Sequence, residues 1–106
     1  MNEKAIVHAL SALAHEHRLR VYRALVVAGS GGLTPGGMVG MCGIAPATLS
    51  FHLKELLHAR LATHERHGRH RVYRADYARM NEVMGYLTRN CCQGEPCALE
   101  TPATCA

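Results

Sequence analysis

The sequence predicts a mainly α-helical fold with one β-hairpin, an α+β class, on three observations. Apolar residues recur at spacings of three and four along several segments, as they do in amphipathic helices. Clusters of glycine and proline separate these segments. The 106 residues with 48% hydrophobic content fit one folded domain rather than a disordered chain. Because a chain this short buries a limited core, a partner subunit is expected to add to its stability.

Four helical segments are expected in the first part of the chain. The first two cover residues 3–14 and 16–28, and "GSGGLTP" ends the second. Thr34 then supplies a capping hydroxyl, and Pro35 a preset first turn, for a short helix over residues 35–41. That helix contains three glycines, each costing about 1 kcal/mol relative to alanine, so it needs tertiary support. After the turn "CGI", the segment "APATLSFHLKELLHARL" is the clearest helix of the chain.

A basic hairpin and one more helix are expected next. The arms "ATHER" and "RHRVYR" flank Gly68, which is typical of a hairpin turn. The last helix is expected over residues 77–90. A short helix, a turn, a longer helix and a basic hairpin describe a winged helix-turn-helix. We therefore expect this domain over residues 1–90 and a cysteine-rich tail over residues 91–106.

The longer helix carries the predicted contacts to DNA. At about 100° per residue, Leu49, Leu53 and Leu56 fall on one side and form its core face. Phe51 points away from that face, where it could pack against a thymine methyl group in the major groove or be covered by a neighbouring loop. The residues of this helix expected to contact DNA are Pro46, Ala47, Thr48, Ser50, Phe51, His52 and Lys54.

The hairpin is predicted to bind phosphate. Five arginines and a single acid, Glu65, lie in and beside it. A basic hairpin next to a reading helix can straddle the phosphate backbone or enter the minor groove. A charged edge that prevents strand pairing is the alternative. The residues expected to contact DNA are Arg66, Arg69 and Arg71, and three histidines of the hairpin are interpreted as polar surface rather than metal ligands.

Net charge, apolar content and the number of cysteines indicate which classes of protein the chain can belong to. The formal net charge of +4 is compatible with a nucleic-acid partner. No apolar run is long enough for a membrane span, and the start "MNEKAIVHALSALAHEH" is too polar for a secretory signal. We expect a cytoplasmic protein with reduced thiols. Five cysteines, an odd number, fit a disulfide framework poorly and favour metal or redox chemistry.

Three segments together resemble the ArsR/SmtB family of metal-responsive winged-helix repressors. "ALSALAHEHRLRVYRAL" is similar to the family's second-helix entry, "GIAPATLSFHLKELLHARL" to its reading helix and "RHGRHRVYR" to its wing. The resemblance spans about residues 9–87. It implies a homodimer that binds a palindromic operator and leaves it when a metal binds. It also implies dimer contacts from the first and last helices, here around residues 6–13 and 80–87.

The cysteines differ from the family's best-known metal sites. Its paired-cysteine site would lie in "LTPGGMVGM", which has no cysteine, and its zinc site on the last helix uses histidines, none of which follows His70. Cys42 stands alone and is expected to be a buried small apolar residue. An arsenic-responsive branch ends its last helix in "NCC" followed by another cysteine, and "LTRNCCQGEPC" resembles it. This resemblance implies Cys91, Cys92 and Cys97 as ligands.

Three thiols suit As(III), because its lone pair leaves three bonding directions, whereas zinc prefers four ligands. Sb(III) is chemically similar. Cys91 lies four residues after Leu87 and is expected to continue the apolar stripe of the last helix. Two alternatives stay open. Zinc or cadmium could be held by four thiols including Cys105, or Cys97 could form a disulfide with Cys91 or Cys92 as a redox switch.

The sequence therefore predicts a repressor that As(III) releases from DNA, with a second copy of the chain as partner and no organic cofactor. Catalysis is not expected. A thiol-based reductase needs cations that hold an oxyanion, but no arginine or lysine follows Arg89, and the tail carries Glu95 and Glu100. A metal carrier would leave the reading helix and the hairpin without a role.

Overall fold

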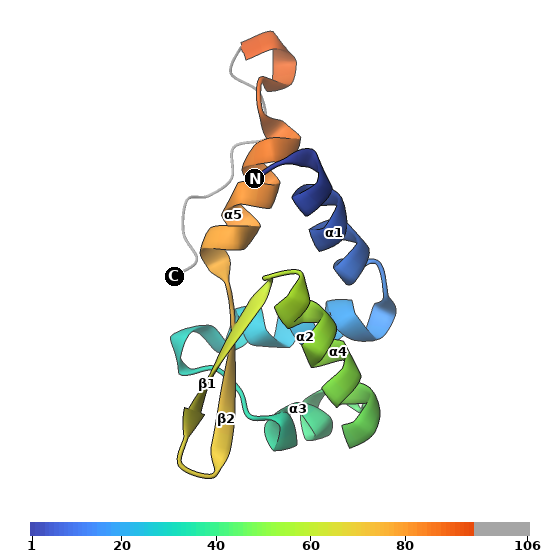
Figure 1. Cartoon of the computed structure of the whole chain (residues 1–106), viewed down its shortest axis with the longest axis vertical. Helices are drawn as coiled ribbons and strands as arrows, with labels where there is room; N and C mark the ends of the chain where they lie inside the picture. Colours follow the sequence, from blue (N-terminus) through green and yellow to red (C-terminus); the bar gives the residue numbers. More distant parts are fainter. Residues whose placement is uncertain (95–106) are drawn as a thin grey trace.

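The structure, a computed structural model, describes residues 1–94 of the chain. Its helices are α1 (Glu3–Leu13), α2 (Glu16–Ala28), α3 (Pro35–Cys42), α4 (Pro46–His58) and α5 (Tyr77–Thr88), and its strands are β1 (Ala62–His67) and β2 (His70–Ala75). Helices α1 and α5 lie side by side at one end of the molecule, and α3, α4 and the hairpin lie at the other (Figure 1). The predicted mainly helical fold with a hairpin wing is confirmed.

Side chains at the helix starts explain why the helices begin where they do. Asn2, Thr34 and Asp76 each accept a hydrogen bond from the backbone amide three residues later, at 2.8, 3.3 and 3.0 Å. Each bond satisfies one of the amides that a helix leaves unpaired at its first turn. The cap predicted at Thr34 is therefore confirmed.

One apolar cluster joins the helices. Leu25 of α2, Met38 of α3, and Leu53 and Leu56 of α4 are at most 2% exposed and belong to the same core. Met38 supplies the tertiary support that the glycine-containing α3 needs. Helix α5 is tied to α2 through the Tyr77 hydroxyl, which donates to the Val26 carbonyl at 3.0 Å.

The loop before α3 is fixed to the hairpin. Strands β1 and β2 pair antiparallel around a turn in which Gly68 has a φ of +62°. Leu33 exchanges two backbone hydrogen bonds with Tyr73 of β2, at 2.8 and 2.9 Å. Gly32 permits this approach, because a Cβ at its position would lie 2.6 Å from the Tyr73 carbonyl oxygen. The start of α3 is therefore held beside the wing.

The end of α5 differs from its prediction. The helix stops at Thr88 rather than Asn90, because Arg89 has an extended ψ of 128° and Asn90 a φ of +58°. Cys91 and Cys92 lie in a separate 3₁₀ turn, Cys91–Gly94. The prediction that Cys91 continues the apolar stripe of the last helix is wrong for this reason. Cys97 and Cys105 lie outside the described residues, as does most of the predicted tail.

Within residues 1–94, none of the helices has the length and apolar character that crossing a bilayer requires.

Candidate nucleic-acid interface

Helix α4 presents one face to the core and another to solvent. Leu49, Leu53 and Leu56 are buried, as their spacing predicts. Six of the seven residues predicted to contact DNA are exposed: Pro46, Ala47, Thr48, Ser50, Phe51 and Lys54. Phe51 is 54% exposed, and no loop of the described chain covers it. The small residues near the start of α4 allow its backbone to approach a partner surface closely.

His52 is the exception among the seven. It is 3% exposed and lies on the buried side of α4 against the rings of His15 and His17, so the prediction that it contacts DNA is wrong. It stands three residues after Leu49 and four before Leu56, so it shares the buried face of the helix. Burial lowers the pKa of the His52 imidazole, and the nearby His15 and Arg18 lower it further. The neutral form is therefore favoured.

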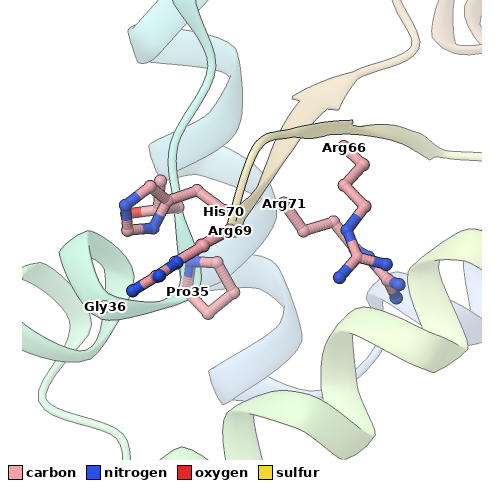
Figure 2. Close-up of a pocket in the computed structure, with 7 residues that line it drawn as sticks. Pro35, Gly36, Arg66, Arg69, His70 and Arg71 are labelled. Atoms are coloured by element: carbon pink, nitrogen blue, oxygen red, sulfur yellow. The ribbon is translucent and has the colours of Figure 1, made fainter.

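The wing presents a cluster of arginines. Arg66 and Arg71 occupy opposite positions in the two strands, and both are exposed. Residues opposite each other in an antiparallel pair share a face, where two like charges are unfavourable unless an anion lies near them. Figure 2 shows Arg66 and Arg71 projecting together, with Arg69 and His70 next to the start of α3.

A cleft lies between the wing and the start of α3. It has a volume of about 470 Å³, and its lining includes the capping residue Thr34, Pro35 and Gly36 from α3, and Arg66, Arg69, His70 and Arg71 from the wing. Three guanidinium groups beside a helix start make a suitable environment for an anion such as a backbone phosphate. Sequence reasoning missed the α3 residues here, because the Leu33–Tyr73 pairing that brings them to the wing has no local signal.

A fourth arginine of the wing is engaged within the fold. The Nε of Arg74 donates to the Ser30 carbonyl at 2.7 Å, and its guanidinium pairs with Glu65. Hydrogen bonds from His67 and Arg74 hold the pKa of the Glu65 carboxyl below its usual range. The only acid of the hairpin is thus neutralised locally, which leaves the charge of Arg66, Arg69 and Arg71 available to a partner.

The cysteines fall into two environments. Cys42 is 5% exposed in the core, where burial raises the pKa of its thiol despite the opposing charge of Arg20. Its predicted role as a buried small residue is confirmed. Cys91 is half-buried and Cys92 is exposed, in the turn after α5. This turn, drawn in orange beyond α5, lies at the opposite end of the fold from the wing (Figure 1).

Comparison with known proteins agrees with this geometry. A family model described as a helix-turn-helix domain matches residues 13–65, which is half of the chain and includes α2, α3 and α4. The chain belongs to this helix-turn-helix family. The helix-turn-helix predicted from the sequence is confirmed by this match, which is to no enzyme family.

Individual relatives support the same conclusion. The chain is 51% identical over 39 residues to YdfF of Bacillus subtilis (strain 168), an uncharacterised HTH-type transcriptional regulator, although the match covers 37% of the chain and only 17% of that protein. An ArsR-like transcriptional regulator from Rhodococcus sp. RHA1 has a similar fold, with a TM-score of 0.73 at 22% identity over 81% of the chain and 78% of that structure.

A third similar protein is a homodimer. It is a winged helix-turn-helix DNA-binding domain from Mycobacterium bovis described as a possible ArsR-family regulator. Its TM-score is 0.64 at 21% identity, over 87% of the chain and 85% of that structure. At this level of identity the structural matches show the fold alone. This helix-turn-helix chain therefore has the fold of ArsR-like regulators.

Proposed function

We propose that this chain is an ArsR-type transcriptional repressor that binds double-stranded operator DNA through α4 and the wing. The observation that carries the proposal is the joint exposure of the outer face of α4 and the three wing arginines beside the start of α3. A helix in the major groove reads bases, while cations on either side of it bind phosphate and fix the register. No enzyme chemistry is needed for this role.

The repressor acts as a homodimer in this proposal. Val7 and Leu10 of α1 and Met84 and Leu87 of α5 are 39–55% exposed, and these helices form the end of the molecule opposite the wing. An apolar surface of this kind on a small domain is suited to a second copy. Ile6, at the edge of the predicted dimer segment, is instead buried within its own chain. A Leu87→Glu variant is expected to sediment as a monomer, and an unchanged dimer would contradict this arrangement.

Arsenite is the proposed inducer, with Cys91, Cys92 and Cys97 as its ligands. Each thiol replaces one hydroxyl of arsenous acid, which leaves as water, so no oxidant or reductant is required. Support comes from the number of thiols, the preference of As(III) for three soft ligands and the exposure of Cys92 to solvent. Sb(III) has the same ligand preference and is included as an inducer.

The inducer acts through α5. Cys91 and Cys92 follow the end of this helix by three and four residues, so closing a ring of three As–S bonds constrains the chain directly after it. Because α5 packs on α1 at the proposed dimer end, its shift changes the spacing of the two copies of α4. A coupling free energy of about 1–3 kcal/mol, usual for allostery, weakens operator binding by about 5- to 150-fold.

Operator affinity across a panel of metals tests this function. The full chain is titrated on its own upstream DNA, by fluorescence anisotropy, with arsenite, antimonite, zinc, cadmium and an oxidant. We expect arsenite and antimonite to weaken binding, and the Cys91→Ser, Cys92→Ser, Cys97→Ser variant to be insensitive. Cys42→Ala is the matched control and keeps the response. Release by zinc or cadmium alone, or by the oxidant alone, would overturn arsenite as the inducer.

A further inference from the structure

Three histidines from two distant parts of the chain lie together where α2 meets α4. His15 precedes α2, His17 lies in its first turn and His52 lies in α4. Their ligating atoms all fall within 4.8 Å of one another, and the ring centroids of His15 and His52 are 4.6 Å apart. No other three histidine, cysteine or acidic side chains gather this closely within residues 1–94.

We propose that His15, His17 and His52 form a site for a divalent transition-metal ion of the zinc class, which ties the start of α2 to α4. Imidazole is a preferred zinc ligand, and three imidazoles with one water complete a tetrahedron. Zinc–nitrogen bonds of about 2.0–2.1 Å place ligand nitrogens about 3.4 Å apart. Since His15 is exposed and His17 half-buried, their rings have room to close the remaining distance.

The buried member of the cluster supports a ligand role. The Nδ1 of His52 is inaccessible to solvent and has no hydrogen-bond partner among the described residues. Buried polar atoms in folded proteins are nearly always partnered, so an isolated imidazole nitrogen is unusual. Coordination through Nδ1 would supply the missing partner.

The Nδ1 atom of His15 also carries a lone pair that could bind a metal ion. Its Nδ1 accepts a hydrogen bond from the His17 backbone amide at 3.1 Å, so the proton of the neutral ring lies on Nε2. A metal ion that binds Nδ1 replaces this helix cap. Asparagine is a better cap than histidine and a poor metal ligand. A His15→Asn variant therefore removes the ligand while keeping the start of α2 intact.

The local charges limit the affinity of the site. The positive end of the α2 dipole and the Arg18 guanidinium oppose a cation, while the Glu55 carboxylate near His52 favours one. Three neutral ligands also bind zinc with less charge compensation than thiolates do. The site is therefore expected to bind more weakly than a site of cysteine thiolates, and the tail cysteines must be removed to measure it.

Metal binding to the untagged chain with Cys91, Cys92, Cys97 and Cys105 replaced by serine tests the proposal. Cobalt(II) is the spectroscopic probe, and zinc competes with it. We expect one ion per chain, with ligand-field bands of a nitrogen–oxygen site and no thiolate charge-transfer band. His15→Asn and His17→Gln are each expected to weaken metal binding by about tenfold or more. Replacing even a group that hydrogen-bonds to a metal ligand lowers metal affinity by about 10–100-fold. His58→Gln, on the same helix as His52, is the matched control and binds as the parent does.

A thermal melt supplies a second readout. Saturating zinc is expected to raise the midpoint of the chain without the four tail thiols, and of its His58→Gln variant, by several degrees, and to leave His15→Asn unchanged. No cobalt or zinc binding below millimolar concentration, or equal binding by His15→Asn and the parent, would overturn the site. Neither DNA nor arsenite enters these measurements, so this proposal and the proposed function fail independently.

Discussion

The wing arginines make a quantitative prediction about salt. Arg69→Gln and Arg71→Gln together remove two exposed cations per chain, and therefore four from a dimer. If each contacts one phosphate, the loss of four contacts at about 0.9 each lowers the slope of log affinity against log salt by about 3.6. Because these contacts do not depend on base sequence, a labelled random duplex serves as well as an operator. Fluorescence anisotropy at several salt concentrations gives the slope directly.

A charge-matched control separates contact from net charge. Lys4→Gln with Arg89→Gln removes the same number of cations from α1 and from the end of α5, which lie at the end of the fold opposite the wing. This control is expected to leave the slope close to that of the parent. An unchanged slope in the wing variant, or an equal change in the control, would refute the wing as the phosphate-binding element. Circular dichroism checks that both variants keep their helices.

Three further predictions follow from named residues. Phe51 is 54% exposed, and Phe51→Ala is expected to weaken operator binding several-fold in anisotropy titrations. The free energy of unfolding should change by no more than about 0.5 kcal/mol. Full operator affinity in this variant would show that Phe51 does not contact DNA. Leu56→Ala, at a fully buried position, is expected to lower the free energy of unfolding by about 2–5 kcal/mol in urea, and a smaller loss would contradict the core assignment of α4. Since burial raises the pKa of Cys42, ionisation favours the unfolded chain above about pH 9.0. The urea midpoint therefore falls as pH rises beyond that value in the parent, and the fall is smaller in Cys42→Ala.

Local chemistry made much of the fold predictable. Thr34 before Pro35 marked the start of α3, and the leucine spacing of α4 identified the core face that includes Leu49 and Leu53. Gly68 between two basic arms marked the hairpin turn. In each case the signal lies within a few residues of the feature it predicts, so sequence reasoning reached it.

Features set by distant contacts were not predictable in the same way. His52 was predicted to contact DNA together with its neighbours in α4, but the rings of His15 and His17 lie against it. The spacing of His15 and His17 was a visible signal, yet their partner lies 35 residues later. Likewise, the cleft beside Thr34 depends on the pairing of Leu33 with Tyr73, which no short segment encodes.

The position predicted for Cys91 was wrong because the last helix was expected to reach Asn90, whereas α5 ends at Thr88. Placing Cys91 on the helix assumed continuous helical geometry beyond Leu87. The chain leaves that geometry at Arg89, and Asn90 and Cys92 have positive φ values. Asparagine adopts this conformation more readily than most residues, so "RNCC" carried a local signal for the helix end.

The most direct test of the proposed function is a stoichiometric titration of the DNA complex with arsenite. The dimer and its upstream DNA are mixed near the dissociation constant of their complex, where a several-fold loss of affinity is visible, and bound DNA is followed against arsenic added per chain. Three thiols per chain predict that the loss of bound DNA reaches its endpoint at one arsenic per chain, whether the thiols come from one subunit or two. DNA that stays bound at every ratio, or release that is equal when Cys91, Cys92 and Cys97 are serine, would contradict the account.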